Sequence, residues 1–533
     1  MPDLIPIVSV ILSCVVVVYL GRVIVYRDCT VQPRLCDLPG PSRPHFFHGH
    51  HKEMAGDPGI TDRWRVAFGR TFQFRGLFNI MELHTSDTKA TAHIVSNLLI
   101  YTKTPTTRYN LARLWGDGIM SQEGYEHKIQ RRIMTPVFSG SKMRVFTPIF
   151  NRNATRLRDL WKAEFAHGCE GKKIDVLPWL RRAALDSMGE TGLDYRFNSL
   201  GGGEPSKLMK AIHQLLHTPG SNGTYIIRLA QASFPILRYL PLLGSRNITA
   251  PRNTLLQIGA EILAERKSAV ATAADGAPPI DMLSSMIMVN NALPIEQRLS
   301  DDTLIAQIPT LIVSGHENTS ISTAWALHNL AVHQDMQSKL RAEIFSVQSD
   351  SPTYDELNEL PYLEAVIKES MRLRPSVEYT SRVAAMDDIL PLGEPVVDKR
   401  GKAYSAIPVL KGQKIHLPLR ALNVDKGLWG ADADEFSPER WEKLPEAVST
   451  IPSVYSHLFS FYAGPHGCIA YRYAVIEQKA LLFNLVRSFE FHNAVPPEAI
   501  GRTSGTSFGH PCVLHEREKG TQLPLIVKPY KKQ

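Results

Sequence analysis

Helical periodicity runs through most of this chain. From about residue 50 to about residue 380, apolar residues recur at helical spacing, as in Leu255-Ile258-Ile262-Leu263, and strand-like runs are few. Short extended runs separated by Gly and Pro follow between Arg382 and Arg420, and Pro524-Leu525-Ile526-Val527 also looks extended. A length of 533 residues would allow roughly three or four domains, but no repeat, low-complexity tract or linker interrupts the chain after residue 50. We therefore expect one large domain over residues 51–533, mainly α with small β-sheets.

Composition excludes several classes of protein. With 44% apolar and 21% charged residues, the chain can bury a large core and is not intrinsically disordered. Its 6 cysteines lack C-x-x-C spacing, which argues against a disulfide scaffold and against a structural zinc site. The net charge of +8 is modest and diffuse, so it speaks against nucleic acid as a partner and suits an anionic membrane surface or an acidic protein.

The N-terminus carries a long apolar run. Leu4 to Leu20 is almost continuously apolar, and Val23 to Tyr26 extends it to about the 20 residues that cross a bilayer. An acidic residue, Asp3, precedes the run, and basic residues follow it at Arg22, Arg27 and Arg34. This is the reverse of a cleaved signal peptide, and the charge bias places the rest of the chain in the cytosol. Residues 1–28 are predicted to be a single-pass membrane anchor; the alternative is a buried core helix.

A proline-rich segment follows the anchor. Within residues 29–50, the stretch from Leu38 to Pro44 contains three prolines, which fix φ and favour extended backbone before them. We expect residues 29–50 to be a semi-rigid hinge between the anchor and the globular domain. A second apolar stretch, Tyr225 to Leu243, is interrupted by Arg and Pro, so it is expected to dip into the membrane or to cover a cavity.

One cysteine stands in a setting that favours chemistry. Cys468 follows Gly464-Pro465-His466-Gly467 and precedes a helical pattern. The glycines permit a tight loop, and the N–H groups and positive dipole end of the following helix favour a thiolate, which can ligate a metal. As a haem ligand, a thiolate pushes electron density toward iron and favours O–O cleavage. The alternative for an isolated loop cysteine is a small buried apolar residue.

The segment around this cysteine resembles the haem-binding signature of the cytochrome P-450 family, F-x-x-G-x-R-x-C-x-G. The matching positions are Phe461, Gly464, His466 and Cys468. His466 stands where the family has arginine, and Ala470 where it has the last glycine. The resemblance implies haem b, with Cys468 as the axial ligand of the iron and His466 able to donate a hydrogen bond to a haem propionate.

A second motif supports the resemblance. Glu369-Ser370-Met371-Arg372 lies in a helical run and matches the family's E-x-x-R, and the i, i+3 spacing lets the two charged side chains pair. Alone, such a pair is commonly an exposed helical ion pair. Downstream, Arg440 in Pro438-Glu439-Arg440-Trp441 matches the family's P-E-R-F segment. By resemblance, Glu369, Arg372 and Arg440 form a structural network that holds the cysteine loop.

A third motif lies in a long helical pattern from about Asp302 to Val332. Ser314-Gly315-His316-Glu317-Asn318-Thr319-Ser320 resembles the family's A/G-G-x-D/E-T-T/S on the oxygen side of the haem. The resemblance makes Glu317 the acid of a proton relay, but Asn318 stands where the family has a hydroxyl, and a carboxamide cannot pass a proton as a hydroxyl can. We hypothesise that Asn318 orders a relay water or that a substrate hydroxyl assists. Thr319 can replace the hydroxyl only in a distorted helix, and the alternative for Asn318 is a polar residue at a helix bulge.

Weaker matches concern haem propionates. His127 and Arg131 resemble the family's W-x-x-x-R, and their i, i+4 spacing puts both on one helix face. Arg382 matches another propionate-binding arginine, with an exposed loop arginine as the alternative. By resemblance, a basic face that docks a flavoprotein reductase is expected, and its candidates, which could also be merely solvated, are Lys128, Arg132 and Arg472.

Together the motifs resemble a membrane-anchored haem-thiolate monooxygenase of eukaryotic microsomal type, and the Pro-Leu-Gly-Glu-Pro segment at 391–395 is similar to fungal members. The resemblance implies that two electrons from an NADPH-dependent reductase and O2 are used to oxygenate a lipophilic small molecule, such as a terpenoid of secondary metabolism, at the endoplasmic reticulum. Three alternatives remain. The first is a haem-thiolate isomerase or dehydratase that needs no external electrons, and the second is a membrane-tethered haem sensor. The third is a zinc or thiol hydrolase using Cys468, although the sequence shows no Cys or His cluster with the ligand spacing for zinc.

Overall fold

A computed structural model describes residues 33–42, 45, 48–165, 170–217, 246–272, 280–503 and 507–531 of the chain. The predicted anchor, residues 1–28, and the apolar stretch from Tyr225 to Leu243 lie outside these residues. None of the helices in the described ranges combines the length and hydropathy needed to cross a bilayer.

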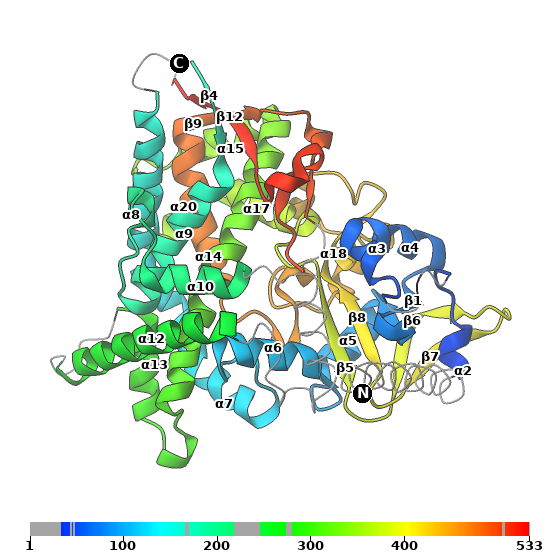
Figure 1. The fold of residues 1–533 in the computed structure, drawn as a ribbon. Helices are drawn as coiled ribbons and strands as arrows, with labels where there is room; N and C mark the ends of the chain where they lie inside the picture. The colour runs from blue at the N-terminus through cyan, green and yellow to red at the C-terminus, as the bar shows by residue number, and fades with distance from the viewer. Residues whose placement is uncertain are drawn as a thin grey trace, which may run out of the picture.

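Most of the described chain is helical, and Figure 1 shows the arrangement. The α-helices are α2 (Pro33–Asp37), α3 (His51–Gly56), α4 (Ile60–Phe68), α5 (Thr88–Ser96), α6 (Pro105–Trp115), α7 (Gly124–Met134), α8 (Gly140–Ala163), α9 (Val176–Leu193), α10 (Lys207–His217), α12 (Arg246–Thr272), α13 (Met282–Asn291), α14 (Asp301–Val332), α15 (Gln334–Ile344), α16 (Tyr354–Asn358), α17 (Pro361–Leu373), α18 (Leu419–Asn423), α19 (Lys426–Trp429) and α20 (Tyr471–Ser488).

The strands form small sheets. They are β1 (Thr71–Arg75), β2 (Met81–Thr85), β3 (Tyr101–Thr102), β4 (Lys172–Asp175), β5 (Tyr379–Ala384), β6 (Asp388–Val397), β7 (Ala403–Val409), β8 (Lys414–Pro418), β9 (Phe489–Asn493), β10 (Ile500–Arg502), β11 (Pro511–Val513) and β12 (Pro524–Pro529). The largest sheet has the order β1-β2-β8-β5-β3, with β2 and β8 parallel and His84 opposite His416. The smaller sheets are β4-β12-β9, β6-β7 and β10-β11.

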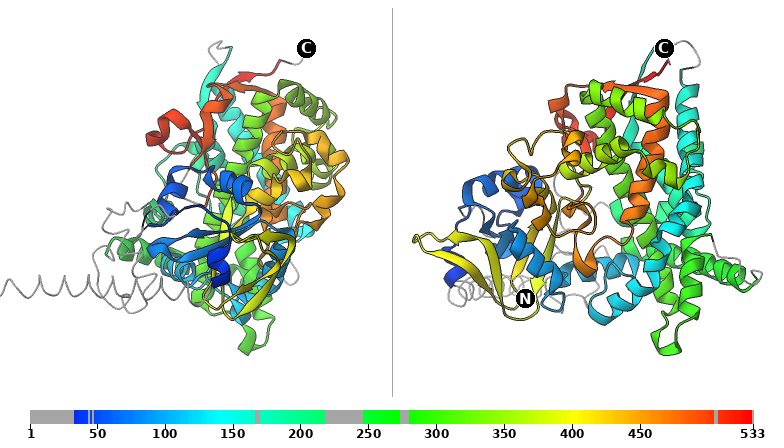
Figure 2. Two further views of the ribbon diagram at one scale, coloured as in Figure 1. Left: turned by 90° about the vertical axis from the view of Figure 1, so that its right-hand side faces the viewer. Right: turned by 180° about the vertical axis from the view of Figure 1, so that it is seen from behind.

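The long helix α14 is the centre of the helical part. Ser300 caps its N-terminus by accepting a hydrogen bond from the Thr303 N–H, and Asp301 and Asp302 complement the dipole in the first turn. Most of its residues are buried, as expected for a helix that is apolar nearly all round. It packs against α9, α12, α17 and α20, and the right-hand view in Figure 2 shows the sheet-rich part on one side of this helical group.

The predicted fold class, mainly α with small sheets, is confirmed. Helices α12, α14, α17 and α20 cover runs of the sequence with helical periodicity. Strands β7, β8 and β12 lie where extended runs were predicted. The expectation of few strands before residue 380 missed β1 to β4, because their pairing partners are distant in sequence and their alternation is short.

Part of the predicted hinge is packed against the domain. Residues 33–37 form helix α2, and Leu35 and Leu38 are buried in the core. The Pro39 carbonyl accepts a hydrogen bond from the Gln73 N–H (2.9 Å), and the Asp37 carbonyl accepts one from the Lys399 N–H (2.8 Å). The chain from Leu35 to Pro39 is therefore held on the sheet-rich part, and does not act there as a free spacer.

Candidate active site

The Cys468 loop is tightly closed by its own backbone. The Cys468 N–H donates to the Phe461 carbonyl (2.8 Å), and the Gly467 N–H donates to the Gly464 carbonyl (2.9 Å). Gly464 has φ +64°, and a Cβ at this position would overlap the carbonyl oxygen of Val95, so only glycine fits. The predicted helix after the cysteine is α20, which begins at Tyr471. The loop thus fixes the sulfur just before a helix N-terminus.

The ionisation of Cys468 depends mainly on its burial. Burial raises the pKa of the Cys468 thiol, and the Ala470 N–H and the Arg131 guanidinium lower it only in part. The favourable helix end that the sequence indicates is therefore outweighed by burial. A coordinating metal deprotonates a thiol outright, so ligation of iron would supply what the protein surroundings alone do not.

Basic side chains surround the loop on one side. Arg131 donates to the Gly467 carbonyl (2.7 Å), and the Arg382 guanidinium lies 4.6 Å from the centre of the Tyr462 ring. The ring centres of His127 and His466 are 4.2 Å apart. Residues predicted from separate motifs to bind propionates, namely His127, Arg131, Arg382 and His466, are therefore brought together beside Cys468.

Two further members of this basic cluster were not found from the sequence. Lys103 donates to the Gln122 carbonyl (2.8 Å), and burial lowers the pKa of Lys103 to about 8. Glu123 Oε2 lies 3.2 Å from Nε2 of His466. No pattern in the sequence marks Lys103 or Glu123, because their place in the site depends on contacts with residues distant along the chain.

The basic cluster carries excess positive charge and unused polar atoms. Burial, and then the neighbouring Lys103 and His127, lower the pKa of His466 to about 2, and burial with Lys103 lowers that of His127 to about 4. Within the described residues, the Tyr462 hydroxyl and both ring nitrogens of His466 are buried without a regular hydrogen bond, although Nε2 of His466 lies near Glu123. Three basic side chains, Lys103, Arg131 and Arg382, lie with one described carboxylate, Glu123, in this cluster. These unused polar atoms and the excess positive charge fit the two propionates of a haem.

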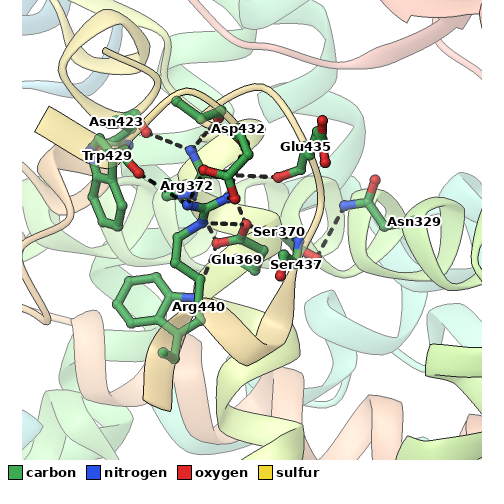
Figure 3. A network of polar contacts seen from close by, with 12 residues as sticks. Asn329, Glu369, Ser370, Arg372, Asn423, Trp429, Asp432, Glu435, Ser437 and Arg440 are labelled. Atoms are coloured by element: carbon green, nitrogen blue, oxygen red, sulfur yellow. Dashed lines mark hydrogen bonds and ion pairs between the residues drawn. The ribbon is translucent and has the colours of Figure 1, made fainter. Parts of the chain in front are cut away.

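The predicted structural network is formed as expected (Figure 3). Glu369 and Arg372 are both 0% exposed, and Arg372 donates to the Glu369 carboxylate through Nε and Nη2, both at 2.8 Å. Arg440 adds an Nε contact to Glu369 Oε1 at 3.3 Å and pairs with Asp432. Two donors complete the shell of this carboxylate, the Ser437 N–H and the Trp441 Nε1–H.

Asn423 connects this network to the Cys468 loop. Its carbonyl accepts from Arg372 Nη1 (2.9 Å), its side-chain amide donates to Ser460 Oγ (2.7 Å), and its side-chain oxygen accepts from the Phe459 N–H (2.9 Å). Ser460 in turn donates to the Met371 carbonyl (2.8 Å). The ion network and the segment that leads into the cysteine loop therefore share one residue.

Glu317 on α14 lies in a charged group of its own. Arg181 of α9 donates to its carboxylate through Nη2 (2.6 Å) and Nε (3.0 Å), and His510 Nε2 lies 2.6 Å from Oε1. Burial alone would raise the pKa of Glu317, but His510 and Arg181 outweigh it and lower the pKa to about 2. In this arrangement Glu317 is an ionised acceptor, and its role as a proton relay stays a prediction. Neither Arg181 nor His510 could be found from the sequence.

Asn318 and Thr319 point to different partners. Asn318 donates from its amide nitrogen to the Ser314 carbonyl (3.1 Å), which leaves its buried side-chain oxygen without a partner. Thr319 is buried and donates to the Gly315 carbonyl (3.0 Å). Because α14 is continuous, there is no distortion that would turn Thr319 toward the position of Asn318. The catalytic roles of both residues stay predictions, and Asn318 offers an unused acceptor.

Gly315 is explained by packing. A Cβ on Gly315 would overlap the Cε of Met188 on α9, so the glycine lets α9 and α14 approach closely. The sequence had suggested that this glycine marks a ligand or a helix distortion.

Glu477 of α20 is a buried acid beside Thr319 that the sequence did not indicate. It is 1% exposed, and burial raises its pKa well above the usual value, although Thr319 and Ser187 lower it in part. Within the described residues, neither carboxyl oxygen has a partner in regular hydrogen-bond geometry. Burial therefore favours the neutral form of Glu477 between α9, α14 and α20.

One open cleft in the described part of the chain lies elsewhere. A cleft of about 1140 Å³ is bordered by α8, α9, α12 and α13, with Arg152, Asn153, Glu190 and Ser284 among its lining residues. None of the residues predicted for the site lines it, so we do not assign it to the substrate.

Comparison with known proteins agrees with the geometry of the site. The cytochrome P450 family model matches residues 39–511. Cytochrome P450 monooxygenase 205 of Postia placenta is 40% identical over 507 residues, covering 93% of each chain. Cytochrome P450 monooxygenase 128 of the same fungus is 39% identical over 92% of each chain, and cytochrome P450 monooxygenase claQ of Ampulloclitocybe clavipes is 32% identical over 93% of each chain. With Cys468 in its loop and these relatives along nearly its whole length, the chain belongs to the cytochrome P450 family and is a monooxygenase of the fungal branch.

Proposed function

We propose that this chain binds haem b and inserts one atom of O2 into a lipophilic small molecule, with electrons that reach it from NADPH through a flavoprotein reductase. The observation that carries the proposal is the Cys468 loop beside a basic cluster with unused buried polar atoms. When bound, the haem supplies the activation of dioxygen, which amino-acid side chains do not perform.

The residues of the chain have separable tasks in this proposal. Cys468 would ligate the iron, and Arg131, Arg382 and Lys103 would balance the charge of the propionates. The uncharged rings of His127 and His466 would offer hydrogen bonds to them. Asn318 holds a water or a substrate hydroxyl through its free side-chain oxygen, since its amide nitrogen is occupied by the Ser314 carbonyl. Glu317 takes up or gives up a proton only if its contacts with Arg181 and His510 loosen, because both hold it ionised.

The reductase is proposed to dock on the face next to the Cys468 loop. Lys128 and Arg132 on α7 and Arg472 at the start of α20 are all exposed. Arg131 of the same α7 contacts the Gly467 carbonyl, so α7 borders the loop. A basic face here suits an acidic protein partner.

The charge pattern of the N-terminus supports a location at the endoplasmic reticulum membrane. Residues 1–28 would anchor the chain in a single pass, residues 29–50 would connect the anchor to the domain, and residues 51–533 would lie in the cytosol. Because the relatives are fungal, we propose that the substrate is a secondary metabolite such as a terpenoid.

The test is the carbon monoxide difference spectrum of the reduced protein. A strongly red-shifted Soret band in the wild type that is lost in Cys468→Ala supports the thiolate ligand. Cys512→Ala is the matched control, because Cys512 is a buried cysteine in β11. Turnover with reductase and NADPH under isotopically labelled O2 should then place one labelled atom in the product. A well-folded wild type without a haem band would refute the proposal.

A second candidate is an isomerase or dehydratase that needs no external electrons. The observation in its favour is the absence of a hydroxyl at Asn318 together with the engagement of the Thr319 hydroxyl by the Gly315 carbonyl. Product formed without NADPH and reductase would establish this candidate and exclude the monooxygenase reaction for that substrate.

A further inference from the structure

Arg374, just after α17, is a largely enclosed charge without an ion pair. Its side chain makes no hydrogen bond or ion pair with any residue in the described ranges, and its guanidinium lies 5.1 Å from the centre of the Trp325 ring. Trp325 itself is 0% exposed and fixed by a hydrogen bond from Nε1 to the Gly509 carbonyl (2.8 Å). All five N–H donors of Arg374 are thus unused within the described chain.

Two more arginines stand next to Arg374. Arg420 of α18 donates from Nε to the carbonyl of Leu373, the residue before Arg374, at 3.1 Å. Arg502, the last residue of β10, donates to Glu378 Oε1 at 2.6 Å. We call Arg374, Arg420 and Arg502 the arginine triad.

The charges around the triad do not balance. Asp62 of α4 pairs with Arg420 (2.7 Å) and lies 3.5 Å from Arg502, and Glu378 pairs with Arg502. Asp434 also acts on Arg420, but it pairs with Lys426 (3.1 Å). Among these described groups, three arginines therefore face Asp62 and Glu378, and one positive charge remains. Side-chain exposures of 15% for Arg420 and 11% for Arg502 show that solvent reaches the group.

Two further features describe the surroundings of Arg374. Burial, and then Arg420 and Arg502, lower the pKa of Arg374 to about 9, although an arginine is ordinarily charged at every physiological pH. His328 on α14, 5.6 Å from Trp325 between ring centres, is 7% exposed, and its Nδ1 is buried without a partner. Buried groups of this kind are normally satisfied by protein, by water or by an ion.

We propose that the arginine triad binds a phosphate-type oxyanion, with Arg374 as its main ligand. A tetrahedral oxyanion accepts several charge-assisted hydrogen bonds and matches the guanidinium fork. The triad is separate from the propionate-binding cluster, because the charges that act on Arg374 come from Arg420, Arg502, Glu378 and Asp62 and not from Lys103, Arg131 or Arg382. The phosphate is either a free anion or the headgroup of a phospholipid.

Thermal unfolding of the haem-loaded full chain tests the proposal. Inorganic phosphate, titrated against chloride at equal ionic strength, should raise the melting temperature with saturation. Arg374→Gln should weaken the apparent phosphate affinity by about tenfold or more. Arg400→Gln is the matched control, because Arg400 is an exposed arginine that pairs with Asp37 and should leave the response unchanged. An equal phosphate response in wild type and Arg374→Gln, or none in the wild type, overturns the proposal.

A second variant separates binding from folding. Glu378→Gln removes a competing negative charge next to Arg502 and should make phosphate bind more tightly, whereas a triad that only supports the fold would give no such gain. This variant keeps the proposal testable if Arg374→Gln does not fold. Weaker or unchanged binding in Glu378→Gln counts against it.

Vesicles distinguish the two sources of phosphate. The full chain is placed in phosphatidylcholine vesicles with and without phosphatidic acid. If phosphatidic acid raises the melting temperature in the wild type but not in Arg374→Gln, and inorganic phosphate competes with this effect, the ligand is a lipid headgroup. If only inorganic phosphate acts, the ligand is a free anion.

Discussion

Replacing Glu369 by glutamine tests whether the buried network holds the molecule together. The carboxylate accepts two bonds from Arg372, one from Arg440, one from the Ser437 N–H and one from Trp441. Glu369→Gln removes the negative charge and turns an amide NH2 group toward these donors. Arg372, which is 0% exposed, is then left as an unpaired buried charge. Breaking a buried pair in this way costs about 3–5 kcal/mol.

The assay is thermal unfolding of wild type and variants. With an unfolding entropy of roughly 2 cal/mol/K per residue, a chain of this size loses about 1 kcal/mol per degree, so Glu369→Gln should lower the melting temperature by about 3–5 °C. The matched control is Asp355→Asn, which breaks an ion pair with Arg144 whose side chains are 56% and 60% exposed. Its effect on the melting temperature should be much smaller, because solvent screens an exposed pair.

A double variant separates the lost charge from the lost packing. In Glu369→Gln/Arg372→Met no unpaired buried charge remains, so part of the stability should return. Our reasoning is refuted if Glu369→Gln is no more damaging than Asp355→Asn, or if the double variant is less stable than the sum of the single changes.

Three other expectations can be checked. Gly464→Ala should reduce haem incorporation more than Gly315→Ala does. The methyl group at Gly464 would meet the Val95 backbone at positive φ, whereas the methyl group at Gly315 would meet the side chain of Met188. Haem absorbance per protein compares the two variants, and equal loss would contradict this. Burial lowers the pKa of His84 to about 3, whereas the unfolded chain binds this proton below the ordinary histidine pKa near 6.5. The free energy of unfolding should therefore fall by about 2 kcal/mol between pH 7 and 5. Urea unfolding of wild type and His84→Gln measures this fall, and the variant should lose less stability. Asn318→Leu removes the free acceptor and should increase peroxide leakage, while Asn318→Thr should change both leakage and turnover; unchanged values in both variants would show that Asn318 orders no water.

Local spacing explains what could be predicted from the sequence. The Cys468 loop, the Glu369 and Arg372 pair and the His127 and Arg131 pair each rest on residues a few positions apart, for which turn or helix geometry decides the contact. The long helices were recognisable for the same reason. Glycine in the loop was correctly predicted to permit a tight turn, because its backbone requirement is local.

Distant contacts explain what could not be predicted. Arg181 and His510 reach Glu317 from 136 and 193 residues away, and Glu123 reaches His466 across an even wider gap in the chain. Spacing within a motif carries no information about such pairs. The orientation of the Thr319 side chain and the role of Gly315 also depend on how α9 and α20 pack against α14. Only the folded chain reveals this packing.

Asn423 has a consequence for how the cofactor is loaded. Its backbone is held by Arg372 while its side chain holds Phe459 and Ser460, so folding of the ion network positions the entrance to the cysteine loop. The sulfur is thereby preorganised by residues outside the cysteine loop. The loop would then already be formed when haem binds, and substitutions between α18 and Arg440 become a way to adjust the position of the sulfur without altering the loop itself.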